Sequence, residues 1–174
     1  MKKYIDFEEG QKELVIPETV TVDRKEYTIT DVNSECYTEL GIEAVTIPKS
    51  FKTVSDSTFR NCQYLIKSVT ISDGITEIDD HTLSGFLFLE SVEIPESVTR
   101  IGKSAFNNCN NLKSIKLPSG ITRIEDSTFS FCGFTELTIP EGVTEIGVDA
   151  FSYTKIESLK FPSSLRQHRT KHVR

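Results

Sequence analysis

Residues 98–118 read VTRIGKSAFNNCNNLKSIKLP, and this stretch decides the fold. Its apolar residues are separated by polar ones, and they are Val98, Ile101, Ala105, Phe106, Cys109, Leu112, Ile115 and Leu117. The alternation in Ile115-Lys116-Leu117 predicts a short strand whose lysine faces outward. Residues 98–101 predict a second short extended piece, and residues 104–109 predict a single helical or 3₁₀ turn.

The strand of this stretch occurs in six copies along the chain. The copies begin at Val45, Val69, Val92, Ile115, Leu137 and Leu159, and the last two steps are each one residue shorter than the two before them. A short and steady period, here roughly 22–24 residues, is typical of a stacked solenoid. One repeat cannot bury its own apolar face, and only stacking against the next repeat makes a core. We therefore expect Phe106, Phe129 and Phe151, which occupy one repeat position, to form a buried column.

The repeats occupy most of the chain and leave two unlike ends. We expect a mostly β solenoid of the α/β type, with residues 32–165 in the repeats, residues 1–31 as an N-terminal β cap and first strand, and residues 166–174 as a disordered basic tail. Asp23-Arg24-Lys25-Glu26 predicts a hairpin turn in the cap. The last repeat has His168 in place of isoleucine, and no cap follows it. Either the array continues beyond this sequence, or this end associates end to end with a second chain.

The charge and hydropathy of the chain exclude some classes of function. Its formal net charge is −6, and residues 166–174 contribute +4 through Arg166, Arg169, Lys171 and Arg174, so the remainder carries −10. A general nucleic-acid-binding protein needs the opposite sign. No stretch has the roughly 20 apolar residues of a membrane span. Lys2-Lys3 is not followed by an apolar segment, which predicts a cytosolic chain or one whose leader is not in this sequence.

The four cysteines do not have the C-x2-C spacing of a zinc site. Cys62, Cys109 and Cys132 fill one repeat position, whereas Cys36 lies in an irregular first copy. We expect them to act as small buried hydrophobes. The alternative is a disulfide between Cys109 and Cys132, because equivalent Cα atoms of adjacent coils lie about 5 Å apart, within disulfide reach.

The residues of an active site are missing from the pattern. The three histidines are His81, in a repeat turn, and His168 and His172 near the end, where no third metal ligand is close in sequence. No phosphate-binding loop and no nucleophile elbow occurs. We expect no catalysis, no cofactor and no metal.

The motif of residues 98–118, repeated in register over residues 45–165, resembles the leucine-rich repeat of the BspA type, also called the Treponema pallidum type. Residues 14–44 resemble the usual opening of such arrays. This chain departs from the pattern at Ser72, which replaces proline, and at Phe86 and Thr154, which replace cysteine. The resemblance implies a right-handed superhelix with one parallel sheet and short turns. It also implies a binding surface on a cell-surface or secreted protein, and some members of the family adhere to fibronectin and fibrinogen.

Two surfaces are candidates for binding. The first is the outward side of the sheet, whose central row is Thr46, Thr70, Glu93, Lys116, Thr138 and Lys160. Beside it, Glu43, Lys67, Glu90 and Lys113 alternate in charge. The charges indicate either a ligand face or cross-strand pairs that only stabilise the sheet.

The second candidate surface is lateral and flanks the cysteine position. Five apolar residues stand there at places that are otherwise polar, and they are Tyr64, Leu87, Phe88, Phe131 and Tyr153. We expect Tyr64 to stack with Phe88 one coil away, and Phe131 to stack with Tyr153. The rings form either binding patches or a local cover for the turn.

The pattern and the resemblance together predict a non-catalytic protein-interaction module. Its partner is expected to be a host or extracellular matrix protein, and its parent an adhesin-like surface or secreted protein. The candidate contact residues are Tyr64, Leu87, Phe88, Phe131, Tyr153, Glu93, Lys116 and Lys160. The alternative is a structural spacer or an intracellular scaffold without a ligand of its own.

Overall fold

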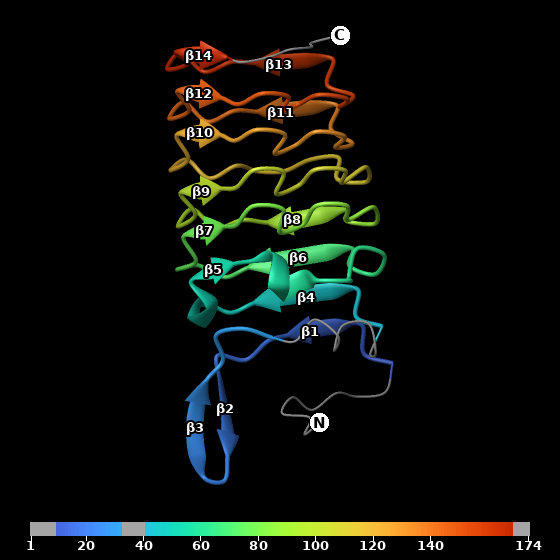
Figure 1. Ribbon diagram of the computed structural model, residues 1–174, viewed down its shortest axis with the longest axis vertical. Helices are drawn as coiled ribbons and strands as arrows, with labels where there is room; N and C mark the ends of the chain where they lie inside the picture. The colour runs from blue at the N-terminus through green and yellow to red at the C-terminus, as the bar shows by residue number, and fades with distance from the viewer. Residues whose placement is uncertain (1–9, 33–40, 169–174) are drawn as a thin grey trace.

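The computed structural model describes residues 10–32 and 41–168. Within them the chain forms short coils that stack along one axis, with a hairpin that projects at one end (Figure 1). Almost all regular structure is β, and the helices among these residues are two short 3₁₀ segments, η1 (Lys49–Phe51) and η2 (Asp56–Phe59). The expected mostly β solenoid is therefore confirmed.

One series of strands carries the repeated apolar triplet. β1 (Glu13–Val15), β4 (Ala44–Ile47), β6 (Ser68–Ile71) and β8 (Ser91–Glu93) pair in parallel in that order, and β11 (Glu136–Thr138) pairs separately with β13 (Ser158–Lys160). The register joins equivalent residues of successive repeats, since Val69 lies opposite both Val45 and Val92. The central apolar residue of each strand faces the core.

A second series of parallel strands lines the neighbouring side of the coils. β5 (Thr53–Val54), β7 (Glu77–Ile78) and β9 (Arg100–Ile101) form one sheet, and β10 (Arg123–Ile124), β12 (Glu145–Ile146) and β14 (Gln167–His168) form another. The expectation of a single parallel sheet therefore needs correction. The second extended piece of each repeat, expected from the sequence, pairs with its equivalent in the next coil and makes its own ladder. The repeat also continues past residue 165, because β14 pairs with β12.

Both series are interrupted at the same coil. No hydrogen-bonded ladder joins β9 to β10 in the described structure, and residues 112–118, between β8 and β11, form no strand there. The strand predicted for Ile115-Lys116-Leu117 is therefore wrong as a paired strand. The interruption spans the longer step from Val92 to Ile115 and the first shorter step from Ile115 to Leu137, whereas the equally short steps from β10 to β12 and from β11 to β13 are paired.

The N-terminal cap consists of β1 and an antiparallel hairpin of β2 (Thr19–Val22) and β3 (Lys25–Thr28). The hairpin turn is Asp23-Arg24, and both residues have positive φ, 51° and 63°, as a two-residue hairpin of the right-handed twist requires. The hairpin extends away from the coils (Figure 1), and β3 is exposed along its whole length. The first coil is therefore covered by β1, whose Leu14 is fully buried.

The core is one continuous cluster of apolar residues that runs along the stacked coils. Phe129 stacks on Phe106 with 5.6 Å between ring centroids and on Phe151 with 5.8 Å, and the ring planes deviate from parallel by 12° and 6°. The expected column is therefore present. Phe86, which occupies the cysteine position of its coil, packs edge-on against Phe59 at 5.9 Å.

The turns before the cysteine position also hydrogen-bond from coil to coil, which the sequence pattern did not predict. We call this set the turn ladder. In one coil pair the N–H groups of Ser104, Phe106 and Asn108 donate to the carbonyls of Asp126, Thr128 and Ser130. In the next pair Ser127, Phe129 and Phe131 donate to Val148, Ala150 and Ser152. The turn ladder therefore crosses the coil at which both strand series are interrupted.

Cys109 and Cys132 are buried free thiols, and Cys62 is buried in the same way. The Sγ of Cys109 donates to the carbonyl of Leu83, and that of Cys132 donates to the carbonyl of Phe106, each at 3.1 Å. Each thiol thus faces a carbonyl of the preceding coil, and the disulfide alternative is wrong. Burial raises the pKa of the Cys109 thiol well above its ordinary value, so it stays protonated. Cys36 lies outside the described residues.

Candidate functional site

Phe131 and Tyr153 form a stacked aromatic pair on the lateral surface, which we call the aromatic stack. Their ring centroids lie 4.4 Å apart and their planes differ by 9°. Phe131 is 43% exposed and Tyr153 is 76% exposed, so the predicted stacking occurs in contact with solvent. The aromatic stack is therefore accessible to a partner.

The backbone at the aromatic stack is unusual for bulky side chains. Phe131 has a φ of 58° and Tyr153 a φ of 59°. The same repeat position holds Asn61, Gly85 and Asn108 in the other coils, and their φ angles are also positive. Glycine and asparagine tolerate this left-handed conformation, whereas a bulky residue adopts it at an energetic cost.

Tyr64, Leu87 and Phe88 lie on the same type of turn, but they do not reproduce this arrangement. Tyr64 is 70% exposed and Phe88 is 46% exposed, and no ring contact joins them among the described residues, so the predicted stacking is wrong. The two turns differ locally. The Leu65 and Leu89 N–H groups donate alike to the carbonyl of the residue at the cysteine position of their own coils, but in the later turn a further bond forms, from the Leu87 N–H to the Gly85 carbonyl. The rings are therefore placed differently along their coils.

The charges on the outward side of the first strand series stabilise the sheet. Glu43 accepts hydrogen bonds from both Lys12 and Lys67, and its contact with Lys67 is 2.6 Å long. These two lysines lower the pKa of Glu43 from 4.5 to about 2. The predicted cross-strand pairing is therefore present between Glu43 and Lys67. Glu90 and Lys113 form no ion pair within residues 10–32 and 41–168.

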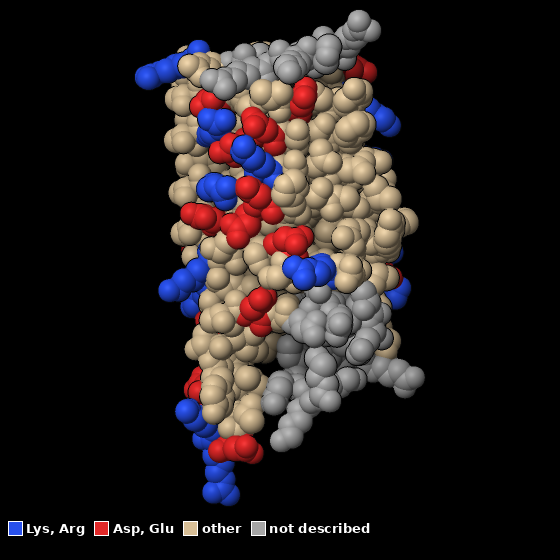
Figure 2. Space-filling view, in the orientation of Figure 1, with Lys and Arg blue, Asp and Glu red and all other residues tan. Residues whose placement is uncertain are grey.

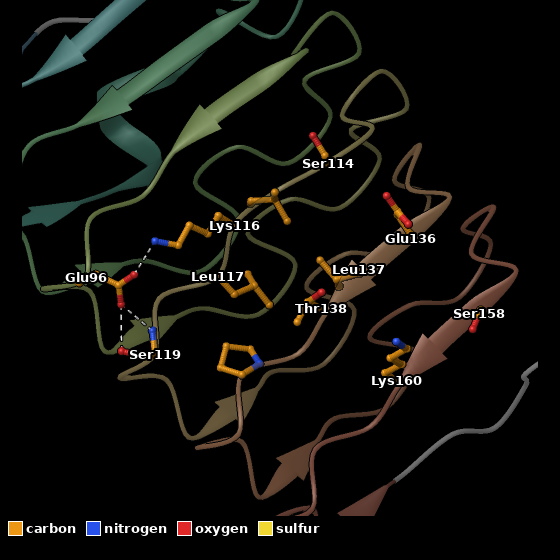
Figure 3. Close-up of a pocket in the computed structure, with 12 residues that line it drawn as sticks. Glu96, Ser114, Lys116, Leu117, Ser119, Glu136, Leu137, Thr138, Ser158 and Lys160 are labelled. Carbon is orange, nitrogen blue, oxygen red and sulfur yellow. Dashed lines mark hydrogen bonds and ion pairs between the residues drawn. The ribbon is translucent and has the colours of Figure 1, made fainter.

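A hollow of about 640 Å³ lies on this outward side, where the strand series is interrupted. We call it the sheet hollow, and Figure 3 shows its lining. Its lining includes the outward-facing residues Lys116, Thr138 and Lys160. It also includes Leu117 and Leu137, whose side chains face the core. Both leucines are buried, and they line the hollow from below, where no paired strand closes the sheet.

One side of the sheet hollow is held rigidly by Glu96. This carboxylate accepts hydrogen bonds from the Ser119 N–H at 2.8 Å and the Ser119 hydroxyl at 2.9 Å, and it forms an ion pair with Lys116 at 2.9 Å (Figure 3). The Ser119 N–H and the Lys116 ammonium lower the pKa of Glu96 from 4.5 to about 2. Lys160 forms no ion pair in the described part of the chain, so its charge is available to a ligand.

A belt of charged residues follows the second strand series, and Figure 2 shows acidic and basic side chains interleaved over β7 to β12. Arg100 pairs with Asp79 and Asp80, Lys103 pairs with Asp126, and Arg123 pairs with Glu125 and Glu145. The Val148 N–H lowers the pKa of Asp126 by donating a hydrogen bond to it. Four of these five ion pairs join neighbouring coils, and the Arg123–Glu125 pair lies within one coil.

The structure brings only some of the predicted contact residues together. Phe131 meets Tyr153 in the aromatic stack, and Lys116 and Lys160 line the sheet hollow. Glu93 is exposed on β8 and does not line the hollow. The repeat pattern does not predict the hollow, because repeat steps of the same lengths are paired elsewhere in the stack.

The described residues contain no cluster of three or more potential metal ligands. None of their helices is long and apolar enough to cross a membrane.

Comparisons with known proteins agree with this architecture. Residues 30–157 match the BspA type leucine rich repeat region in six copies. No curated protein matches the chain.

Similar solved structures include leucine-rich repeat proteins and a vaccine antigen. The crystal structure of the pneumococcal vaccine antigen PcpA is similar over 91% of this chain and 43% of that chain, with 27% identity and a TM-score of 0.72. A leucine-rich repeat protein from Bacteroides ovatus is similar in fold over 91% of this chain and 49% of that chain, with 24% identity and a TM-score of 0.63. The T. pallidum leucine-rich repeat protein is similar in fold over 74% of this chain and 70% of that chain, with 23% identity and a TM-score of 0.63.

The chain thus spans less than half the length of the first two of these proteins. The match to the repeat region covers well over half of the chain itself. The protein therefore belongs to the BspA-type leucine-rich repeat family.

Proposed function

We propose that this chain is a non-catalytic protein-interaction module of an adhesin-like surface or secreted protein, and that the aromatic stack contacts a host or extracellular matrix protein. Leucine-rich repeat proteins are in general interaction modules, and the likeness to a vaccine antigen supports a role in contact with a host. The observation that carries the proposal is the exposure of Phe131 and Tyr153 on a strained backbone.

A turn that only needs to be formed does not require aromatic residues at this position. Asn61 and Asn108 occupy it in other coils with the same sign of φ. The left-handed conformation costs most residues with a Cβ about 1–2 kcal/mol, and asparagine adopts it more readily. Exposed aromatic rings are common anchors of protein interfaces, because they bury a large area with little loss of rotamer freedom. The proposed contact of the two rings with a partner protein accounts for aromatic residues at positions where they cost stability.

The proposal is tested by replacing both rings with the residue that other coils use. Surface plasmon resonance would measure binding of the chain to immobilised fibronectin and fibrinogen. We expect the wild type to bind at least one of them, and Phe131→Asn/Tyr153→Asn to bind it at least about tenfold more weakly, as the loss of an interface anchor predicts.

The matched control is Tyr27→Asn, since Tyr27 is 47% exposed on the β2–β3 hairpin, away from the aromatic stack. This variant should bind as the wild type does. Equal affinity of the double variant and the wild type would show that the aromatic stack is not the contact surface. If the wild type binds neither protein, the matrix-adhesin proposal fails.

A structural spacer is the second candidate, and the ion pairs between coils favour it. The belt formed by Arg100, Lys103 and Arg123 joins successive coils without using an outside ligand. The spacer predicts no binding in the same experiment. It is also compatible with end-to-end self-association through the coil of β13 and β14, which sedimentation velocity at increasing concentration would detect.

A further inference from the structure

The backbone hydrogen bonds of the first strand series stop at one coil and resume at the next. The N–H groups of Lys67 and Ser68 donate to the Glu43 carbonyl at 2.7 and 3.2 Å. Those of Glu90 and Ser91 donate in the same way to the Lys67 carbonyl, at 2.8 and 3.3 Å. Two equivalent steps are then missing in the described structure, and the bonding resumes where the Glu157 N–H donates to the Thr135 carbonyl.

The missing steps leave residues 113–117 unpaired, and we call them the open segment. Within the described residues, no backbone N–H or carbonyl of the open segment hydrogen-bonds to β8 or to β11. A strand normally pairs these groups with its neighbours, so the open segment presents a short row of free donors and acceptors.

The open segment nevertheless keeps the facing pattern of a strand. Ser114 and Lys116 are exposed, Ile115 is half-buried, and Leu117 is buried. Leu112 is fully buried at one end of the segment, and the turn ladder holds the preceding turn against the next coil. The backbone is therefore placed for pairing before any ligand arrives, which lowers the entropy cost of binding.

The sheet hollow lies directly over the open segment and opens toward β11 and β13 (Figure 3). Its volume of about 640 Å³ is within the usual range of a ligand pocket. Leu117, Leu137 and Pro140 give it an apolar base, while Lys160 places an unpaired positive charge at its far side. The site therefore combines backbone hydrogen-bonding groups, apolar surface and one available cation.

We propose that the open segment and the sheet hollow bind an extended peptide of a partner protein, which adds as a short strand along residues 113–117. Main-chain hydrogen bonds supply the affinity in this mode of recognition, and pockets for alternate side chains supply the specificity. The peptide has apolar side chains at alternate positions for the base of the hollow, and an acidic side chain that reaches Lys160. The proposal is independent of the aromatic stack.

The free protein provides the first test. Hydrogen–deuterium exchange measured by NMR should show that the amides of Ile115 and Lys116 exchange much faster than those of Val69 and Thr70, their equivalents in β6. Equal protection at the two places would overturn the proposal, because it would show that the open segment is already paired.

The second test uses a peptide with the sequence of residues 66–73, IKSVTISD, which includes β6 and ends in an acid. In its native place this sequence pairs in parallel with strands on both sides. We expect the peptide to slow exchange at Ile115 and Lys116 saturably, and a scrambled peptide of the same composition to have no effect. No change with the native-order peptide would overturn the proposal.

Two variants of Lys116 distinguish the contribution of its backbone N–H to peptide binding from that of its side chain. Lys116→Pro removes the N–H donor and the charge, whereas Lys116→Ala removes only the charge. We expect the affinity of Lys116→Pro for the peptide to be at least about tenfold lower than that of Lys116→Ala, because only the proline variant lacks the N–H donor. Equal affinities of the two variants would contradict strand pairing.

Lys160→Glu provides a readout that does not depend on the folding of the proline variant. Reversal of this charge should weaken binding of IKSVTISD, and an unchanged affinity would contradict the predicted acidic contact. Phe131→Asn/Tyr153→Asn should bind the peptide normally, so this proposal and the proposed function fail in different experiments. Protection of Ile115 that rises with protein concentration in the absence of peptide would show that a second copy, not a partner peptide, occupies the site.

Discussion

Phe131 and Tyr153 have backbone angles that their side chains disfavour, and they are largely exposed at the same time. Two contributions to stability oppose each other there. The left-handed conformation costs about 1–2 kcal/mol for each residue. The ring contact at 4.4 Å returns about 1 kcal/mol for the pair. Local stability alone therefore does not explain these two side chains.

This balance predicts that asparagine at both positions stabilises the protein. Tyr153→Asn alone should leave the free energy of unfolding within about 0.5 kcal/mol of wild type, because strain relief offsets the lost ring contact. Phe131→Asn/Tyr153→Asn should raise it by about 1 kcal/mol, since both strains are relieved and only one contact is lost. Urea denaturation followed by circular dichroism measures both values. A double variant less stable than wild type by about 1 kcal/mol would instead show that the rings cover the turn.

The single residues of the core were easier to predict than those of the surface. Phe129 lies between Phe106 and Phe151 because all three occupy one position of the repeat. The surface pair Tyr64 and Phe88 also shares a repeat position but does not stack. A buried ring is constrained on all sides by its neighbours, whereas an exposed ring follows the local turn, and the two turns differ in their hydrogen bonds.

At the scale of elements, carboxylates join the proline corners of successive coils. Glu96 accepts from the N–H and hydroxyl of Ser119, and Glu141 accepts from the same groups of Ser163 at 3.0 and 2.7 Å. Hydrogen bonds to an ionised carboxylate lower its pKa, because they favour the charged form. These contacts therefore make the stability of the coil stack depend on pH.

The corner at Glu96 predicts a loss of stability in acid. The pKa of Glu96 is lowered from 4.5 to about 2, so its stabilisation is complete above about pH 4.5 and is lost as the pH falls toward 2. Thermal unfolding of Glu96→Gln at several pH values should therefore show a smaller fall in Tm between pH 4.5 and 2 than wild type shows.

Glu93→Gln is the matched control, because Glu93 is exposed and its side chain forms no hydrogen bond or ion pair within the described residues. Its Tm should change with pH as that of the wild type does. Parallel pH curves for Glu96→Gln and wild type would contradict the assigned role of the Ser119 contacts.

The interruption of the two strand series also belongs to this scale, and it can be compared with the lengths of the repeat steps. The steps from Ile115 to Leu137 and from Leu137 to Leu159 are each one residue shorter than the step from Val92 to Ile115. The shorter step does not by itself prevent pairing, because β11 pairs with β13 and β10 pairs with β12 across steps of the same length. The strand predicted from Ile115-Lys116-Leu117 has the correct alternation, but it pairs neither with β8, across the longer step, nor with β11, across the shorter one.

At the scale of the whole molecule, stability comes from contacts between neighbouring coils. The strand ladders are interrupted in the middle of the stack, but the turn ladder and the phenylalanine column continue across the same coil. The core cluster accordingly includes buried residues from Leu14 to Ala150. We infer that the described coils unfold together.

The reactivity of the buried thiols at increasing urea concentration tests whether the coils unfold together. In a Cys36→Ser variant, Cys62, Cys109 and Cys132 should not react with an aromatic disulfide reagent in native buffer, because they are buried and the pKa of Cys109 is raised. All three should become reactive at one urea concentration, which mass spectrometry of labelled peptides would detect. Reaction of Cys132 well before Cys62 would show instead that the stack unfolds in two parts at the interruption.

The sequence alone determined the solenoid, the buried phenylalanine column, the small buried cysteines and the hairpin of the cap. Each of these follows from local spacing, since a residue that recurs at one position of a steady period meets its own equivalents in the next coil. The tertiary structure alone decided the second strand series, the turn ladder, the ring pair that stacks and the open segment. These depend on how successive coils are offset against each other, which the alternation of apolar and polar residues within one repeat does not specify.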